Sequence, residues 1–164
     1  MKQTSTIFLQ VVLVLMGILA LFAIIRLPLT EGRARNLDLF SIYADPLILY
    51  GYAASIPFFI ALYKAFKLLG YIGQNKAFSP MSVRTSKSIK HSAIVLGVLI
   101  VVAGLYIRIF HHKEDDPAGF IAMCIVIAFV SIVVATAAAV FEKILQNGVD
   151  ILSGNEQLYE QAKK

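Results

Sequence analysis

Four long apolar runs constrain the fold of this chain more than any other feature. They cover residues 7–25, 47–69, 93–110 and 118–141. Because a helix rises about 1.5 Å per residue, about 20 residues cross a hydrocarbon core of about 30 Å. Apolar residues make up 59% of the 164 residues, more than the interior of a small soluble helical bundle would bury. The sequence therefore predicts an all-α integral membrane four-helix bundle with antiparallel neighbours, forming a single membrane domain over residues 1–164.

The first run has two interpretations, a cleaved signal peptide or a retained anchor. Lys2 supplies a positive charge before the run, as in a signal peptide. The apolar stretch is longer than a signal peptide requires, however, and no A-x-A cleavage site follows it; the nearest candidate is Ala20-Leu21-Phe22-Ala23. We expect the run to remain as the first membrane span.

Proline positions indicate where two of the other helices begin and where one bends. Asp45-Pro46 is a typical helix start, with an N-cap followed by a first-turn proline. Ser79-Pro80 repeats this pattern and predicts a helix that runs from Pro80 into the third span. Pro57 lies within the second span, where it removes a backbone hydrogen bond, so the sequence predicts a kink there.

The distribution of basic residues predicts the orientation in the membrane. If the N-terminus is inside, the inner segments carry ten Lys and Arg residues and the outer segments carry five. The inner residues are Lys2, Lys64, Lys67, Lys76, Arg84, Lys87, Lys90, Lys143, Lys163 and Lys164, and the outer ones are Arg26, Arg33, Arg35, Arg108 and Lys113. By the positive-inside rule, both termini are expected in the cytoplasm of a bacterium, with the chain in the inner membrane.

The expected cytoplasmic hairpin, residues 70–91, ends in a basic helix face. Arg84, Lys87 and His91 recur at helical spacing, and Lys90 lies beside them. One interpretation is that this basic face contacts anionic lipid and helps to orient the protein in the membrane. Another is that a cytoplasmic protein docks on it. Direct binding of nucleic acid is not expected, because a face held at the bilayer cannot follow a DNA groove.

The expected cytoplasmic tail, residues 142–164, continues the fourth helix as an amphipathic segment. Its apolar residues fall at helical spacing: Phe141, Ile144, Leu145, Val149 and Leu152. Ser153-Gly154 predicts that the helix stops near residue 152 and that the remaining residues are frayed. The apolar stripe needs a cover, which is either the hairpin around Phe78–Val83 or a partner protein.

Small residues recur along the third and fourth spans. Gly97 and Gly104 share one face of the third span, and Ala128, Ser131 and Ala135 share one face of the fourth. Small side chains let helices approach closely in lipid. The two stripes predict either packing of these spans within one bundle or a homo-oligomer.

No constellation of residues indicates catalysis or a cofactor. His111, His112 and Asp115 are weak metal candidates in a seven-residue turn that imposes no fixed geometry, and a solvated turn is the simpler interpretation. Cys124 is the single cysteine, and its apolar neighbours favour a buried, inert thiol over a reactive one. We expect a protein that is not an enzyme and holds no cofactor.

The middle of each span lacks Asp, Glu, Lys, Arg and His. Such residues at membrane depth mark proton pumps, ion-coupled transporters and voltage sensors, so these classes are disfavoured. Two function classes stay open. One is a regulatory or interaction protein, which a dry bundle with an exposed basic hairpin would favour. The other is a small oligomeric transporter or channel subunit for an uncharged or small solute, which a water-filled cavity would favour.

Two segments resemble a known bacterial membrane family, catalogued as domain of unknown function 2975. They are the inner segment Gly70–Ser79 (GYIGQNKAFS) and the tail from Glu142 through Asn147 to Glu156. The resemblance implies a four-span protein without an established activity. It also implies a candidate cytoplasmic partner, a small Cro-like helix-turn-helix regulator whose gene often lies beside that of a family member. The acidic stretch typical of the family tail is replaced here by Ser153-Gly154-Asn155-Glu156, with fewer acids.

Overall fold

The computed structural model describes residues 3–30, 46–110 and 118–163. They form four helices: α1 (Gln3–Thr30), α3 (Pro46–Gly73), α4 (Pro80–Phe110) and α5 (Ala118–Ala162). Each helix is long and apolar enough to cross a membrane. The predicted all-α fold with four candidate transmembrane helices is therefore confirmed.

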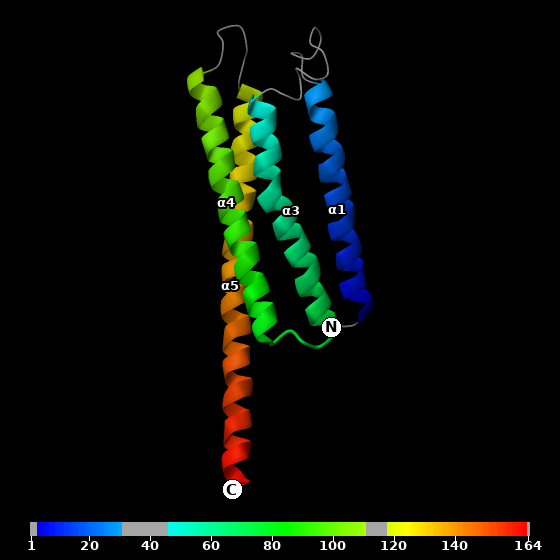
Figure 1. The fold of residues 1–164 in the computed structure, drawn as a ribbon, viewed down its shortest axis with the longest axis vertical. Coiled ribbons are helices and arrows are strands. Elements are labelled where there is room, and N and C mark those ends of the chain that lie inside the picture. Colours follow the sequence, from blue (N-terminus) through cyan, green and yellow to red (C-terminus); the bar gives the residue numbers. More distant parts are fainter. Residues whose placement is uncertain (1–2, 31–45, 111–117, 164) are drawn as a thin grey trace.

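The helices form an antiparallel bundle in which each one packs on its neighbours in the sequence (Figure 1). α4 makes its most extensive contacts with α5, α3 packs on α4, and α1 packs on α3. α1 is consequently the most loosely held helix of the part that the structure describes. The start of α1, the connection from α3 to α4 and the protruding end of α5 all lie on one side of the bundle, here called the hairpin end.

The turn between α3 and α4 has a defined geometry at both helix ends. Asn75 adopts a left-handed backbone conformation with φ of 57°, which Asn tolerates better than most residues. The amide of Lys76 donates to the carbonyl of Tyr71 and that of Asn75 to Ile72, which is the Schellman arrangement that closes a helix. The Oγ of Ser79 accepts the amide of Ser82 at 3.3 Å, so the predicted cap does precede the helix that begins at Pro80.

Small and polar residues join α1 to α3. A Cβ on Gly73 would lie 3.0 Å from Thr6, and one on Gly17 would lie 2.9 Å from the Leu62 side chain. The Gln10 amide donates to the carbonyl of Phe66 at 3.3 Å. These close approaches let a helix with a largely lipid-exposed surface keep its place beside α3.

A polar contact also joins α3 to α4 within the spanning region. The Tyr50 hydroxyl donates to the carbonyl of Leu99 at 2.8 Å.

Pro57 is a buried residue in the middle of α3, and the helix continues past it to Gly73. The bend expected at Pro57 stays a prediction.

The end of α5 differs from the sequence-based expectation. The helix does not stop at Ser153-Gly154 but continues to Ala162. A glycine in a helix costs about 1 kcal/mol relative to alanine, and the good helix formers that follow it, Glu156 to Ala162, offset this cost. Two local bonds also support the helix: Gln146 donates to Asp150 at 2.9 Å, and the Ser153 hydroxyl donates to the Asp150 carbonyl at 3.0 Å.

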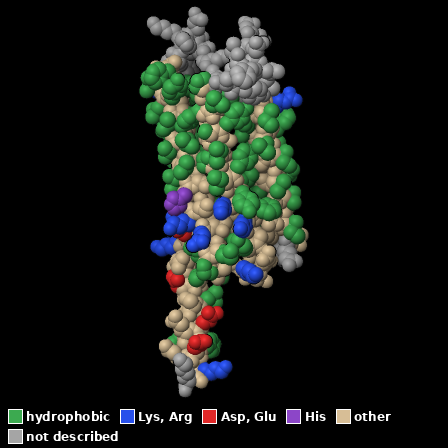
Figure 2. Space-filling view, viewed as in Figure 1, with side chains coloured by type: hydrophobic (Ala, Val, Ile, Leu, Met, Phe, Trp, Pro, Cys, Tyr) green, Lys and Arg blue, Asp and Glu red, His purple; other side chains and the backbone are tan. Residues whose placement is uncertain are grey.

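The outer surface of the bundle is apolar along most of its length, with charges gathered near the hairpin end (Figure 2). Lys and Arg side chains lie where the body of the bundle ends. Acidic side chains lie mainly on the narrower protrusion of α5 below it. Within the described residues, this is the distribution of a protein with a lipid-facing belt and a charged membrane boundary at the hairpin end.

Candidate functional site

A cluster of buried apolar residues lies at the hairpin end, where three helices meet. Leu68 of α3, Ile89 of α4, and Ala138 and Leu145 of α5 form one cluster, and Val83 packs against it. Leu145 is only 2% exposed. A residue expected in the tail is thus part of the core, so the start of the α5 extension is held firmly against the α3–α4 connection.

Two serines of α4 are fully buried in this region. The Ser86 hydroxyl donates to the carbonyl of Ala138 at 3.0 Å and so joins α4 to α5. The Ser82 hydroxyl donates to the carbonyl of Lys76 at 3.0 Å and joins α4 to the turn before it. A buried polar group must find a partner, and both do so across elements, which fixes the turn relative to the helices.

An ion pair closes the same junction. Lys90 of α4 and Glu142 of α5 approach within 2.6 Å, and their side chains are 25% and 20% exposed. Of the basic residues predicted to face a partner or lipid, Lys90 is therefore committed to a bond within the chain.

We expect removal of this ion pair to weaken the junction moderately. Glu142→Gln should lower the free energy of unfolding by about 1 kcal/mol, because the pair is largely but not fully shielded from water. Unfolding in mixed detergent and SDS measures the loss. Glu156→Gln, which removes an exposed carboxylate from the same helix, should change stability little. A double-mutant cycle with Lys90→Gln that shows no coupling would contradict the assignment.

The other basic residues predicted at this site remain exposed. Arg84, Lys87 and His91 lie on the open side of α4, and Lys143 lies on the open side of α5. The His91 ring donates from Nδ1 to the Lys87 carbonyl at 2.8 Å. Among the described residues, Arg84, Lys87 and Lys143 form no ion pair within the chain, so they are free to meet an external anion.

The apolar stripe of the α5 extension is covered only at its start. The Phe78 ring occupies the space that a Cβ on Gly148 would need, so the α3–α4 turn covers this stretch of α5. From Asp150 to Lys163 every residue is exposed. Ile151 is 65% exposed, Leu158 64% and Tyr159 79%. Beyond Gly148 the helix thus presents an apolar face that nothing in the described chain covers.

The predicted small residues lie between α4 and α5. A Cβ on Gly97 would be 3.3 Å from that of Ser131, and one on Gly104 would be 3.4 Å from that of Cys124. Ala135 is buried at the same interface, and Ala128 is half-buried. These contacts lie within one chain, which is the first of the two arrangements that the sequence left open.

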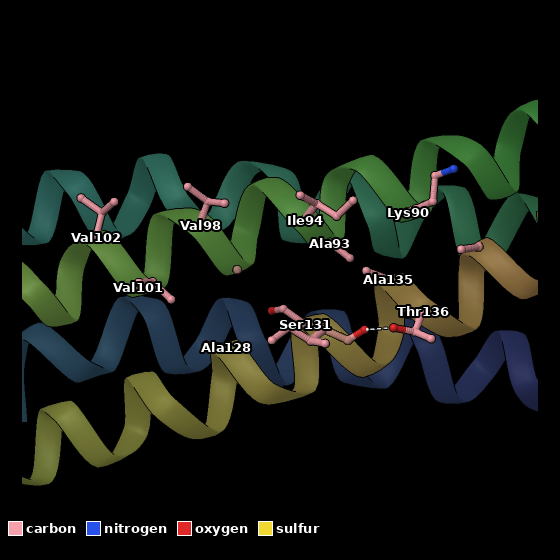
Figure 3. Close-up of a pocket in the computed structure, with 13 residues that line it drawn as sticks. Lys90, Ala93, Ile94, Val98, Val101, Val102, Ala128, Ser131, Ala135 and Thr136 are labelled. Carbon is pink, nitrogen blue, oxygen red and sulfur yellow. Dashed lines mark hydrogen bonds between the residues drawn. The ribbon is translucent and has the colours of Figure 1, made fainter.

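Beside this interface runs an open groove of about 620 Å³ (Figure 3). α4 and α5 form its two walls, and Lys90 lies at one end and Val102 at the other. The lining is apolar apart from Lys90, Ser131 and Thr136. Both hydroxyls are engaged within α5, Ser131 with the Ile127 carbonyl and Thr136 with that of Ile132, each at 2.8 Å. The groove therefore offers an apolar surface to a ligand.

The metal candidates His111, His112 and Asp115 lie outside the described residues. Within residues 3–30, 46–110 and 118–163, no group of three or more metal-ligating side chains comes together. Cys124 is a buried free thiol in contact with the Gly104 face of α4.

The fold and the charge pattern define a multi-helix membrane protein. The chain belongs to the family described as "Protein of unknown function (DUF2975)", whose model matches residues 3–157. It is 41% identical over 158 residues to the uncharacterized membrane protein YoaS of Bacillus subtilis (strain 168), covering 95% of this chain and 98% of that protein. No solved structure matches the chain. The resemblance stated from the sequence is thus confirmed.

Sequence reasoning missed the contacts that rigidify the hairpin end. Lys90 and Glu142 are 52 positions apart, as are Ser86 and Ala138. One sequence pattern did indicate a closely packed helix face. Ser82, Ser86 and Ala93 recur at i, i+4 and i+11, so these small residues share one face of α4. Small residues on one face predict a close helix neighbour, but they do not identify which residues it contributes.

Proposed function

We propose that the hairpin end lies in the cytoplasm of a bacterial cell and that the protein spans the inner membrane. By sequence, the segments expected on this side carry ten Lys and Arg residues, and those expected on the other side carry five. On the face shown in Figure 2, Lys and Arg side chains cluster where the body of the bundle ends. Positive residues beside short connections are retained in the cytoplasm during insertion, which supports this orientation.

Cysteine labelling tests the orientation. In a Cys124→Ala background, Gly32→Cys should react with a membrane-impermeant maleimide added to intact cells, and Gln74→Cys should react only after the cells are opened. Gly32 lies in the segment expected outside, and Gln74 in the turn after α3. Labelling of Gln74→Cys in intact cells, with Gly32→Cys protected, would reverse the assignment.

We further propose that the protein is not an enzyme but a membrane anchor that docks a cytoplasmic protein. The observation that carries this proposal is the exposed apolar face of α5, which projects from the buried cluster at the hairpin end. An exposed helix of this length is marginal in water unless something packs on its apolar side. Solvent-exposed apolar patches of this kind commonly mark interaction sites.

The position of the face favours a cytoplasmic partner over a second copy of α5. Gly148, Ile151 and Leu158 share one side of the helix, since they recur at i, i+3 and i+10. Phe78 already lies against Gly148 on that side. A second, straight α5 that packed along the face would run into the α3–α4 turn. A globular partner below the turn has no such conflict.

The candidate partner is the small helix-turn-helix regulator suggested by the family resemblance. Such a regulator would be held at the membrane through contacts with the α5 face. This proposal gives the apolar face a role and leaves DNA contact to the regulator. The alternative, a transporter or channel subunit, has less support, because the groove between α4 and α5 has an apolar lining unsuited to a hydrated solute.

Paired variants of α5 test the docking proposal. Ile151→Glu with Leu158→Glu places two charges on the apolar face, and should abolish co-purification of the regulator with the full-length protein in mild detergent. Ser153→Glu with Gln157→Glu adds the same charge to the opposite side of the helix and should leave the regulator bound. Both positions of each pair are exposed, so folding is preserved.

The outcome separates three cases. Loss of the regulator only in the apolar-face variant supports docking there. Retention of the regulator in both variants removes the α5 face from the interaction. Failure of the wild-type protein to retain the regulator contradicts this choice of partner.

A further inference from the structure

We propose that the groove between α4 and α5 is a binding site for one anionic phospholipid of the cytoplasmic leaflet. An acyl chain would lie in the apolar part of the groove, and the phosphate would lie against the basic side chains beyond its end. This site is separate from the α5 docking face. Only its assignment to the cytoplasmic leaflet depends on the orientation proposed above.

The length of the groove matches a single leaflet. Along α4 its lining extends from Lys90 to Val102, and along α5 from Ala128 to Ala139. At about 1.5 Å per residue these stretches measure about 18 Å and about 16 Å. Half of a hydrocarbon core of about 30 Å is about 15 Å. A groove that ends near the bilayer centre suits an acyl chain, whereas a neighbouring helix would continue across both leaflets.

The lining is open to lipid and complementary to an acyl chain. Ala93, Gly97 and Ala135 form a shallow floor, because small side chains bring the two helices close together. Ile94 and Val98 on α4 and Ile132 on α5 form the walls and are about half exposed or more. Figure 3 shows Ile94 and Val98 on α4 and Ala135 on α5 along the groove.

Unpaired cations from both helices lie beyond the Lys90 end of the groove. Lys87 is one turn before Lys90 and shares a face with Ile94 and Val98, at i, i+7 and i+11. Lys143 is one turn after Ala139 and shares a face with Thr136. Both lysines are exposed, and neither forms an ion pair in the described chain.

The Lys90–Glu142 ion pair lies at this end of the groove and strengthens the inference. The Nζ of Lys90 lies 2.6 Å from the Oε2 of Glu142, which neutralises Lys90 and joins α4 to α5. The two walls of the groove are therefore held together at this end. Lys87 and Lys143 are left to meet a phosphate. The same charges disfavour a second copy in the groove, because its own lysines would approach them at the same depth in the membrane.

Native mass spectrometry of the full chain in detergent tests the site with three probes. They are dioleoylphosphatidylglycerol, dioleoylphosphatidylcholine and inorganic phosphate. We expect one phosphatidylglycerol per chain to bind, phosphatidylcholine to bind at least about tenfold more weakly, and phosphate alone not to bind at the same concentration. These three arms separate a lipid headgroup joined to its acyl chains from a free anion. Binding of the lipid to the protein in detergent does not depend on how the protein is oriented in the cell membrane.

Two pairs of variants locate the bound lipid. Lys87→Gln with Lys143→Gln should weaken phosphatidylglycerol binding about thirtyfold, since each charge contributes about fivefold. Lys64→Gln with Lys67→Gln removes the same charge from α3 and should have little effect. Ala139→Phe should fill the groove and block binding, and Ala137→Phe, on an exposed side of α5, should not.

Each remaining outcome overturns the proposal. Equal losses from the two lysine pairs would mean a general surface potential without a site. Full binding by Ala139→Phe would place the acyl chain elsewhere. A dimer that Ala139→Phe dissociates, with no lipid bound to the wild-type chain, would identify a second copy as the occupant.

Discussion

Leu145→Ala should lower the free energy of unfolding by about 2–4 kcal/mol, one of the two largest effects that we expect from a single substitution. Leu145 is 2% exposed and belongs to the cluster that joins α3, α4 and α5. Truncation of a buried leucine removes apolar contacts and leaves a cavity. Because the cluster positions the start of the α5 extension, the variant should also increase hydrogen exchange around Phe78.

Ile144→Ala is the matched control for this substitution. Ile144 is the preceding residue on the same helix, but it is 53% exposed. Its truncation should cost well under 1 kcal/mol. Unfolding of both variants in mixed micelles gives the comparison. Equal losses would mean that the α5 extension is not packed against the hairpin end as described.

Gly97→Leu should separate α4 from α5 and destabilise the protein by about 1–3 kcal/mol. A Cβ at this position already lies 3.3 Å from the Cβ of Ser131, so a larger side chain has no room without a shift of one helix. Thermal unfolding in detergent and cysteine cross-linking between the two helices measure the effect. Gly97→Ala should cost much less, since it adds only one carbon.

Gly51→Leu is the control for the larger side chain. A Cβ at Gly51 meets nothing within 4 Å, so the leucine should be accommodated on the surface of α3. The replacement also raises helix propensity. A Gly97→Leu protein as stable as the Gly51→Leu protein would show that the small residues do not hold α4 and α5 together.

Much of the architecture could be predicted because membrane spans leave strong local signals. The apolar runs identified four helices, and Ser79-Pro80 placed the start of α4 at the residue where the structure begins it. These signals are local: each depends on span length or on a few neighbouring residues. The end of α5 was missed because Ser153-Gly154 is a local stop signal that the helix formers after it override.

The contacts that form the candidate site could not be predicted in the same way. The sequence placed Ser86 and Lys90 in the helix predicted from Pro80, but their partners, the Ala138 carbonyl and Glu142, lie 52 positions away. Pairing them requires the rotation and depth of α5 relative to α4. A single sequence specifies the faces of each helix and leaves the register between helices undetermined.

The structure connects stability at the hairpin end with the proposed role. The cluster around Leu145, the two buried serines and the Lys90–Glu142 pair all lie where α5 leaves the bundle. Rigid support at this point holds the direction of the protruding helix. A partner that binds the α5 face would then meet a helix already formed at its base, which reduces the entropy lost on binding.

Site-specific photo-crosslinking in living cells tests the docking proposal most directly. A photoreactive amino acid replaces either Ile151 or Leu158 on the apolar face of α5, or Ser153 or Gln157 on the opposite side. Docking predicts one discrete crosslinked product from Ile151 and Leu158, with the helix-turn-helix regulator as the second component, and none from Ser153 or Gln157. Equal crosslinking from all four positions, or products that contain only this chain or lipid, would contradict it.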